Sequence, residues 1–326
     1  MLGINGRTSG GTAGRFNGRV TVVLSAASAR TDVLNQLLCN QTTVTDFSAT
    51  IQQMLDWSYR KIERIDARLL LQHVMQVSHA YLITHAEARL STETAGQFMK
   101  LVSQREQGVP VAYLTGEREF YDLVFKVSPA VLIPRPETEL LVETALANIP
   151  QSRPFRILDL GTGSGAVGIT IARHRPAAYV TAVDVSIDAI DIAKWNARKL
   201  SVNNIQIIQG NWFEAFATGA VFDLIVSNPP YVAKNDPHLL LGDLRFEPDL
   251  ALSTHDNGLA CIRHIIAAAP MYLVDGGKLL LEHGYDQASI SQQLLQASGY
   301  RNIYSLTDLA GIERVCGGSY GVVKSV

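Results

Sequence analysis

Two kinds of hydrophobic periodicity divide the chain, and the first of them is helical. From residue 46 to about residue 108, apolar side chains recur at spacings of three and four, beginning with Ile51, Met54 and Leu55. The same spacing continues at Ile65, Leu69, Leu70, Val74, Phe98, Leu101 and Val102. Because this is the period of one face of an α-helix, it predicts a small helical bundle, with Ser91 as one helix cap.

The second kind of periodicity begins at Arg156, where short apolar runs alternate with amphipathic stretches. The runs expected to form strands are RILDL (156–160), YVTAVDV (179–185), IQIIQG (205–210), FDLIVS (222–227) and GKLLLEHG (277–284). Alternation of this kind predicts an α/β fold in which helices cover both faces of a doubly wound parallel sheet. Ligands of such sheets bind at the carboxyl ends of the strands.

The segment between these two regions contains a hairpin signal. Gly108 and Pro110 interrupt the helical pattern, and AYLTGEREFYDLVFKVS (112–128) then alternates apolar and polar residues around a glycine. We therefore expect a disordered tail over residues 1–45, a helical domain over 46–110, a hairpin linker over 111–130 and a sheet domain over 131–326.

A capped helix is predicted directly after the hairpin, in VLIPRPETELLVETAL (131–146). Pro136 suits a first helical position, and Leu140, Leu141 and Ala145 supply a buried stripe. Capping does not explain Arg135, which is held between two prolines.

Composition excludes several classes of protein. A chain of 326 residues with 47% hydrophobic content can bury more than one core, and a net charge of −2 provides no overall attraction to nucleic acid. Cys39, Cys261 and Cys316 are far apart, which argues against disulfides or structural zinc. No run is long and apolar enough for a membrane span. We expect a cytoplasmic protein without a metal site.

The first 30 residues have an unusual composition. They carry Arg7, Arg15, Arg19 and Arg30, and no acidic residue precedes Asp32. This composition resembles a transit peptide, and it also fits a disordered tail or a start codon assigned too far upstream. The composition leaves these three readings open, although we favour the disordered tail or the upstream start.

A glycine-rich turn follows the first strand of the expected sheet. In DLGTGSGAVGI (159–169), Gly161, Gly163 and Gly165 let the backbone approach a ligand where a Cβ would clash. Asp184 ends the next strand and is placed to accept hydrogen bonds from ribose hydroxyls. The spacing differs from the G-x-G-x-x-G of dinucleotide enzymes.

This turn resembles motif I of class I S-adenosylmethionine-dependent methyltransferases. The resemblance implies that Gly161, Thr162, Gly163, Ser164 and Gly165 lie against the methionine end of that cofactor, while Asp184 holds its ribose. In GNWFEA (210–215), Asn211 and Trp212 are then candidate walls for the adenine ring. A tryptophan in the protein core would also explain Trp212.

The sequence SNPPY (227–231) follows the fourth strand, where the cofactor's methyl group would lie. It resembles the (D/N)PP(Y/F) motif of methyltransferases that act on planar, amide-like nitrogens. Two acceptors can fix such an NH₂ group: the side-chain oxygen of Asn228 and the carbonyl of Pro229, which the two prolines make rigid. Tyr231 can stack on the flat amide, and Pro230 completes the substrate corner. Because the amide would be held in a reactive orientation, neither a metal ion nor a strong base is expected to be needed.

Five features together resemble the bacterial release factor glutamine methyltransferases of the HemK/PrmC family. They are IPRPETE (133–139), DLGTGSG (159–165), NPPY (228–231), RFEP (245–248) and the helical N-terminal module. The resemblance covers residue 48 onward. It implies methyl transfer from S-adenosylmethionine, with S-adenosylhomocysteine as product, to N5 of the Gln in the Gly-Gly-Gln loop of class 1 release factors.

The resemblance also carries expectations about partners. The helical domain is expected to dock the release factor, and the protein is expected to act as a monomer without a direct nucleic-acid requirement. By motif match alone, Arg135 and Glu247 are placed near the site.

Rival functions use the same chemistry on other substrates. A sister family methylates a ribosomal protein on glutamine, and PRPETE here matches the release-factor type. DNA adenine-N6 and RNA guanine-N2 methyltransferases usually carry a basic binding region, which this chain's charge does not support. A non-catalytic cofactor-binding adaptor would have a damaged glycine loop, Asp184 or Asn228, and all of these are intact.

Overall fold

The computed structural model describes residues 49–216, 219 and 221–321. The expected tail over residues 1–45, with Cys39, lies outside the described residues. Among the described residues, no helix has both the length and the apolar character that a bilayer crossing requires.

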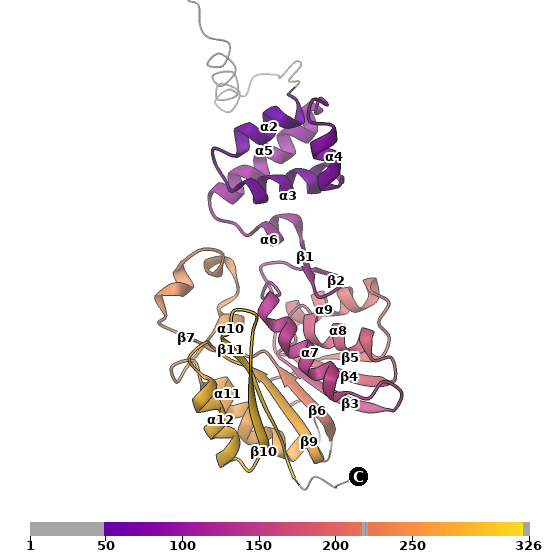
Figure 1. The fold of residues 1–326 in the computed structure, drawn as a ribbon, viewed down its shortest axis with the longest axis vertical. Coiled ribbons are helices and arrows are strands. Elements are labelled where there is room, and N and C mark those ends of the chain that lie inside the picture. The colour runs from indigo at the N-terminus through magenta and orange to yellow at the C-terminus, as the bar shows by residue number, and fades with distance from the viewer. Residues whose placement is uncertain (1–48, 217–218, 220, 322–326) are drawn as a thin grey trace, which may run out of the picture. The chain divides into compact units, whose positions relative to one another are not determined.

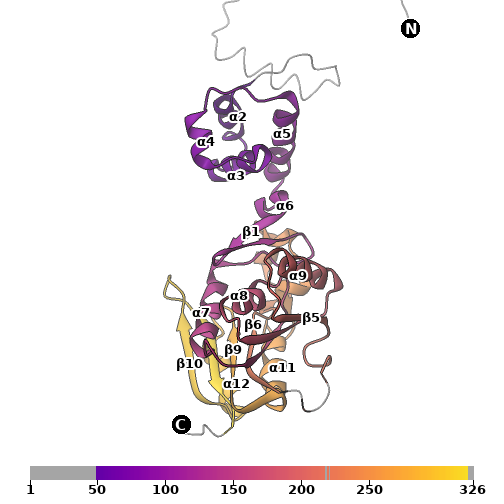
Figure 2. The same ribbon diagram turned by 90° about the vertical axis from the view of Figure 1, so that its right-hand side faces the viewer.

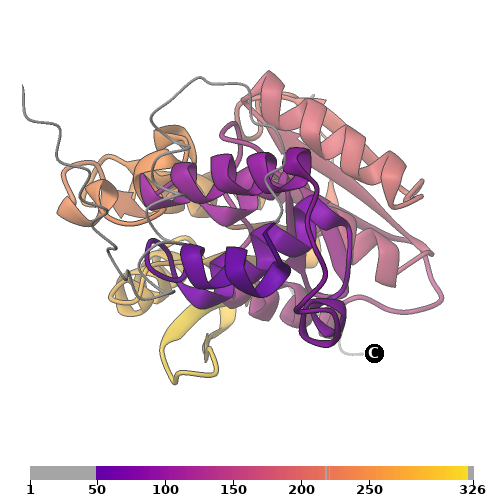
Figure 3. The same ribbon diagram turned by 90° about the horizontal axis from the view of Figure 1, so that it is seen from above.

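The first part of the described chain is helical. Its helices are α2 (Ile51–Ser58), α3 (Arg64–Met75), α4 (His79–Thr84), α5 (Thr92–Glu106) and α6 (Val111–Thr115). α3 packs against α2, α4 and α5, and the indigo and violet helices of this cluster lie beside one another in Figure 3. The predicted cap is confirmed, because Ser91 accepts a hydrogen bond from the Thr94 amide at the start of α5.

In α3, the apolar spacing does not mark the face that is buried. In α3 the buried side chains are Ala67, Leu70 and Leu71. Ile65 and Leu69 are 68% and 45% exposed. The face is rotated because α3 packs on neighbours along the Leu70 side, and spacing alone does not distinguish the two faces.

A hairpin and a capped helix lead into the sheet. Strands β1 (Glu117–Phe120) and β2 (Leu123–Lys126) pair antiparallel, with Glu117 opposite Lys126. The chain then forms the short helix η1 (Pro136–Thr138) with Pro136 in its first turn, followed by α7 (Glu139–Asn148). The buried stripe is confirmed, since Leu141 and Ala145 are fully buried and Leu140 packs against the core.

The central sheet has seven strands in the order β10-β11-β9-β6-β3-β4-β5. Their bounds are β3 (Phe155–Leu160), β4 (Ala178–Asp184), β5 (Ile205–Gln209), β6 (Phe222–Ser227), β9 (Leu273–Glu282), β10 (Arg301–Thr307) and β11 (Glu313–Ser319). The five predicted strands are present and run parallel. The expectation of a parallel sheet was incomplete, because β11 pairs antiparallel with both β9 and β10.

Alternate residues of the central strands bury against two layers of helices. On one face Ile157, Leu224 and Leu280 pack with α7, α8 (Ala166–His174) and α9 (Ile187–Lys199). On the other face Leu158, Ile225 and Leu281 pack with α11 (Ala260–Ala268) and α12 (Ala288–Ala297). The two layers are visible on either side of the sheet in Figures 1 and 2. This alternation is the period-two signature of a strand buried on both sides.

The remaining elements are short and lie mostly between β6 and α11. They are β7 (Val232–Ala233), η2 (Pro237–Leu240), η3 (Leu244–Phe246), α10 (Asp249–Leu252), β8 (Ser253–Thr254) and, after α11, η4 (Ala269–Tyr272). β7 and β8 pair in parallel. The segment that they enclose therefore returns to the end of β6, beside the NPPY corner.

Candidate active site

A cavity of about 320 Å³ opens at the carboxyl ends of β3, β4 and β6. This is the size and place at which α/β proteins bind small ligands. The predicted site residues that line it are Gly161, Gly163, Asp184, Asn211, Trp212, Asn228 and Pro230. Residues predicted from two separate motifs therefore share one wall.

The glycine loop is organised from beneath by a buried carboxyl group. Asp159 is 1% exposed, and its Oδ2 accepts hydrogen bonds from the Thr162 hydroxyl at 2.6 Å and the Gly168 amide at 3.0 Å. Burial raises the pKa of Asp159 to about 6, although these two hydrogen bonds oppose the shift. A residue larger than glycine does not fit at position 168, because its Cβ would lie 2.7 Å from Asp159 Oδ2.

Three of the predicted loop residues face away from the cavity. Thr162 is buried by its bond to Asp159, and the carbonyl of Ser164 accepts from Asn196 at 2.8 Å. Gly165 caps α8 with a φ of +86°, and a Cβ there would lie 2.4 Å from Ile169 Cδ1. These residues support the loop, while the backbone of Gly161 and Gly163 forms the wall.

Asp184 connects the second strand to the glycine loop. Its Oδ2 accepts from the Gly163 amide at 2.8 Å, and its Oδ1 accepts from the Ser186 amide at 2.9 Å. Each carboxylate oxygen has a further lone pair for a ligand. Burial raises the pKa of Asp184, and its hydrogen bonds to the backbone oppose that shift.

Trp212 lines the cavity in a conformation that is unusual for its residue type. Its φ is +50°, a left-handed conformation that is a true outlier for a bulky side chain. A Cβ on Gly161 would lie 3.5 Å from the indole ring. The strained backbone therefore brings a flat ring against the glycine loop. Asn211 also lines the cavity, and its Nδ2 donates to Glu214 Oε1 at 2.8 Å.

The NPPY corner begins where β6 ends. The Ser227 hydroxyl donates to the Leu160 carbonyl at 2.7 Å and joins the corner to the end of β3. Asn228 Nδ2 donates to Thr138 Oγ1 at 3.0 Å. Because the amide nitrogen is used in this way, Oδ1 is the side-chain atom left to accept a hydrogen bond.

Pro230 lines the cavity beside Asn228, whereas Pro229 and Tyr231 do not. Pro229 is buried, and its carbonyl accepts no hydrogen bond from any described residue. The Tyr231 hydroxyl donates to Glu282 Oε1 at 3.1 Å, and the Tyr231 carbonyl accepts from Gln287 at 3.0 Å. Stacking of Tyr231 on a substrate amide stays a prediction.

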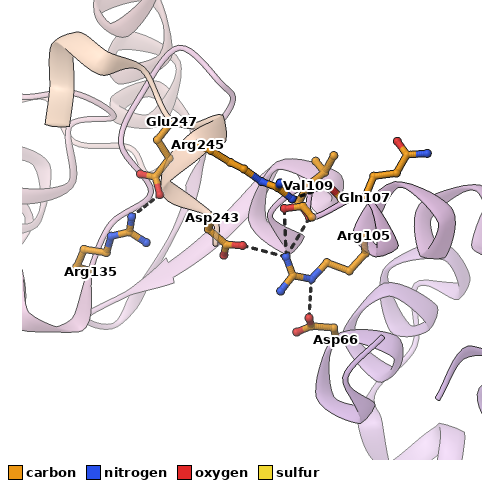
Figure 4. A network of polar contacts seen from close by, with 9 residues as sticks. Asp66, Arg105, Gln107, Val109, Arg135, Asp243, Arg245 and Glu247 are labelled. Carbon is orange, nitrogen blue, oxygen red and sulfur yellow. Dashed lines mark hydrogen bonds and ion pairs between the residues drawn. The ribbon is translucent and has the colours of Figure 1, made fainter. Parts of the chain in front are cut away.

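The IPRPETE and RFEP motifs, which motif matching had placed near the site without assigning them a contact, touch each other in the structure. Arg135 of IPRPETE forms an ion pair with Glu247 of RFEP, whose carboxylate is fully buried. Glu247 also accepts from the Ile133 amide at 3.1 Å. Burial raises the pKa of Glu247, and Arg135 opposes the shift. Figure 4 shows this pair, which fixes the segment after the corner to the segment before α7.

A second arginine in Figure 4 joins the helical part to the same segment. Arg105 of α5 donates to Asp66 of α3 at 2.6 Å and to Asp243 at 2.9 Å. Arg245 donates to the Gln107 carbonyl at 2.7 Å. The segment between β7 and β8 is therefore anchored at several points, although it contains little regular structure.

Several residues that line the cavity or contact the NPPY corner escaped the sequence reasoning. The cavity is also lined by Ala130, Val131, Leu132, Lys234, Pro248, Leu250, Thr254 and His255. Thr138 was interpreted as part of a capped helix, and Glu282 as one residue of the predicted strand over 277–284. The available signal was a glutamate at the end of an otherwise apolar strand, which rarely remains buried without a partner.

The cavity suits a nucleoside ligand. A Cβ at Gly163 would meet no heavy atom within 4 Å, so the bare backbone borders open space. Asp184 supplies carboxylate acceptors suited to ribose hydroxyls, and Trp212 supplies a flat ring suited to a base. Among the described residues, no group of three or more His, Cys, Asp or Glu side chains could hold a metal ion.

Comparison with known proteins identifies both parts of the chain. Residues 49–116 match the PrmC N-terminal domain, and residues 136–243 match the methyltransferase small domain. The hMettl16 catalytic domain, solved in complex with MAT2A 3′UTR hairpin 6, is similar with a TM-score of 0.51 at 14% identity. That match covers 72% of this chain and 84% of that chain. The predicted class I methyltransferase fold, with its helical domain and hairpin, is confirmed.

Curated relatives extend over nearly all of the described chain. A release factor glutamine methyltransferase of Burkholderia pseudomallei is 47% identical over 79% of this chain and 92% of its own length. The protein of the same name from Vibrio cholerae is 48% identical over 78% of this chain and 89% of its own length. The one from Escherichia coli is 47% identical over 79% of this chain and 92% of its own length. Since the likeness spans both the helical domain and the sheet, the chain is a methyltransferase and belongs to the release factor glutamine methyltransferase family.

Proposed function

We propose that the protein transfers a methyl group from S-adenosylmethionine to N5 of the Gln in the Gly-Gly-Gln motif of class 1 peptide chain release factors. The names of the curated relatives support a release factor as the substrate. The observation that carries the proposal is the place of Asn228, which lines the same cavity as Gly161, Gly163 and Asp184. An amide-holding group and a nucleoside-holding wall therefore meet in one space.

The proposed cofactor fits the residues that border the cavity. The backbone of Gly161 and Gly163 would hold its amino-acid end, Asp184 its ribose and Trp212 its adenine. When bound, S-adenosylmethionine supplies a methyl carbon activated by a sulfonium.

The chain's own contribution is to place a poor nucleophile. An amide nitrogen has its lone pair delocalised into the carbonyl, so it must be held close to and in line with the methyl carbon. Asn228 Oδ1 and the Pro229 carbonyl would accept the two N–H bonds of the glutamine amide. Such placement can lower a barrier by roughly 7 to 11 kcal/mol. Held in this way, the amide nitrogen would take the methyl group and release one proton to water, and the electron pair of the broken carbon–sulfur bond would stay with the donor.

The helical domain is proposed to dock the release factor. Ile65 and Leu69 lie one turn apart on α3 and are 68% and 45% exposed. Two large apolar side chains on one exposed helix face are typical of a surface that a partner covers.

A methylation assay tests the proposal against its alternatives. The purified protein is incubated with labelled S-adenosylmethionine and one of four substrates: a release factor, the same factor with Gln→Ala in its loop, ribosomal proteins, or DNA. We expect label only on the intact release factor, with a mass increase of one methyl group on the loop peptide. Label on ribosomal protein or DNA, or on the Gln→Ala factor, would refute it.

A further inference from the structure

The tyrosine of the NPPY corner is held by a buried carboxyl group on a neighbouring strand. The Tyr231 hydroxyl donates to Glu282 Oε1 at 3.1 Å. Glu282 is the last residue of β9 and is 0% exposed. β9 lies next to β6, the strand that leads into the corner. The bond therefore ties the last residue of the corner to an inner strand of the sheet.

This carboxyl group is unfavourable for stability where it lies. Glu282 Oε2 is buried and has no hydrogen-bond partner among the described residues. Arg314, on the adjoining strand β11, is paired with Asp308 at 3.1 Å. Burial raises the pKa of Glu282 to about 7, although the Thr138 and Tyr231 side chains and the Arg314 charge oppose the shift. A buried acid that is only half satisfied costs free energy of folding, so its presence requires an explanation other than stability.

Other contacts fix the two ends of the corner. The Tyr231 carbonyl accepts from Gln287 Nε2 at 3.0 Å, and the Tyr231 ring packs against the apolar layer between the sheet and helices α11 and α12. At the opposite end, the Ser227 hydroxyl donates to the Leu160 carbonyl at 2.7 Å. The corner is thus anchored before its asparagine and at its tyrosine.

The peptide between these two anchors carries the Pro229 carbonyl, which is the proposed second acceptor for the substrate amide. The rings of Pro229 and Pro230 lock φ at both positions, so few torsions remain free in the corner. The direction of the carbonyl is therefore set by the residues on either side. On one side, that position depends on Tyr231.

We propose that Glu282 is a positioning residue for methyl transfer: by holding the Tyr231 hydroxyl, it fixes the end of the NPPY corner and so directs the Pro229 carbonyl at the substrate amide. The inference rests on the proposed function. It assigns a role to the tyrosine hydroxyl, whereas stacking on the substrate would need only the ring. The carboxyl group is thus retained for the geometry of the corner, although it lowers stability.

Removing either partner of this bond should lower turnover. Tyr231→Phe keeps the ring and Glu282→Met keeps a side chain of similar length. Each should lower kcat by about tenfold, while KM and the cofactor dissociation constant change by less than about threefold. The double variant should lose no more than either single variant, because both remove one bond. Glu282→Gln keeps an acceptor and should restore most of the lost turnover.

Stability should respond in the opposite direction. At pH 8, where the carboxyl group is ionised, the double variant should unfold at the same temperature as the unaltered protein or at a higher one. The reason is that both polar partners, together with the unpaired oxygen, are replaced by apolar groups. A merely structural bond would instead make the double variant unfold at a lower temperature, and that result would contradict the proposal.

Tyr300→Phe is the matched control for these variants. Tyr300 is 4% exposed, and its hydroxyl donates to the Ile266 carbonyl at 3.3 Å. The substitution therefore removes another buried tyrosine hydroxyl from the same domain. It should keep kcat.

Three kinetic outcomes would overturn the inference. The first is an unaltered kcat in Tyr231→Phe. The second is a double variant whose loss is the product of the single losses, because the two side chains would then act separately. The third is an equal loss in Glu282→Gln and Glu282→Met, because the acceptor would then be irrelevant.

A further measurement needs no release factor and so separates this inference from the proposed function. In protein with ¹³C-labelled tyrosine, the Cζ signal of Tyr231 is assigned by its absence in Tyr231→Phe. It should shift in Glu282→Met and shift less in Glu282→Gln, since the hydroxyl loses or keeps an acceptor. An unmoved signal in Glu282→Met refutes the bond, whatever the substrate. The expected shifts without any label on the release factor would refute the proposed function instead.

Discussion

Asn228 and Asp184 lie on one cavity and are proposed to serve different ligands. Asp184 is bonded to the backbone of the glycine loop, whereas Asn228 is bonded to Thr138 outside that loop. Their separate anchoring means that removing one side chain should leave the task of the other largely intact.

The two alanine variants should consequently fail in opposite ways. Asn228→Ala should lower kcat by roughly 100-fold or more, with cofactor affinity changed by less than about threefold. Asp184→Ala should weaken cofactor binding by roughly 10- to 100-fold, since hydrogen bonds to a charged group contribute about 1.5 to 3 kcal/mol. Calorimetry and single-turnover kinetics measure the two effects. Unchanged turnover in Asn228→Ala, or an unchanged dissociation constant in Asp184→Ala, would contradict these roles.

Asp159 gives a pH dependence of stability. Its pKa rises from 3.8 to about 6 on burial, so the folded protein holds this proton more tightly than the unfolded chain. The stabilisation is fully present below about pH 4 and is lost as the pH rises through about 6.

Asp159→Asn should remove this dependence. Urea unfolding should show the free energy of unfolding of the unaltered protein decreasing by roughly 2 to 3 kcal/mol more than that of the variant between about pH 4 and pH 8. Parallel curves for the two proteins would show that Asp159 is not the group responsible.

At the scale of elements, the NPPY corner is held by contacts from a distant turn. Gly258 has a φ of +87°, and a Cβ there would lie 2.2 Å from the Tyr231 carbonyl oxygen. Gln287 bonds to that same oxygen and also accepts from the Gly284 amide. The corner therefore depends on the close approach of three loops.

Gly258→Ala should damage both stability and turnover. The left-handed conformation and the clash together should cost about 1 to 3 kcal/mol or more, and the corner must shift to relieve them. Gly96→Ala is the matched control, because Gly96 lies in α5 with no atom within 4 Å of an added Cβ. That control should stabilise the protein by up to about 1 kcal/mol. If thermal unfolding and kcat respond alike in the two variants, the contact with Tyr231 has no such role.

The sequence predicted best those elements whose signals are local. Strand runs, the glycine turn and the Ser91 cap each lie within a few residues, and each was confirmed. β10 and β11 were both missed, and in β11 Gly317 and Gly318 weaken the strand pattern. Packing explains the first of these glycines, since a Cβ at Gly317 would lie 2.5 Å from Leu280 Cδ2.

Contacts between residues far apart in the sequence could not be predicted, because the signals in the sequence are local. Asn228 and Thr138 are 90 residues apart, and Tyr231 and Glu282 are 51 apart. Nothing in either local pattern specifies the partner. Trp212 was predicted as a wall or a core residue, and its left-handed backbone depends on the fold around it.

At the scale of the whole molecule, partner binding should depend on residues far from the cavity. Ile65→Asp combined with Leu69→Asp should raise KM for a full-length release factor by roughly tenfold or more, because a charge replaces apolar area at the proposed docking face. The kinetic parameters for a short Gly-Gly-Gln peptide should stay the same. A similar loss with the peptide would locate the effect at the active site instead.

Arg105 joins the helical domain to the segment beside the cavity, and its two ion pairs differ in exposure. Asp66 and Asp243 have side chains that are 14% and 41% exposed. Asp243→Asn should therefore change the free energy of unfolding by less than about 1 kcal/mol, and Asp66→Asn by more. Asp243→Asn should still raise KM severalfold, because the segment loses an anchor. Denaturation and steady-state kinetics test both parts, and the reverse order of stabilities would contradict the assignment.

The order of strands in the sheet has a consequence for biosynthesis. β11 pairs with β9 at the position of Glu282, opposite Val315. A nascent chain that has emerged as far as β9 already has its glycine loop and NPPY corner, yet Glu282 then stands at an open sheet edge beside water. Hydration would restore an ordinary carboxyl group there. The cavity should thus form earlier during synthesis than the buried hydrogen bond between Tyr231 and Glu282.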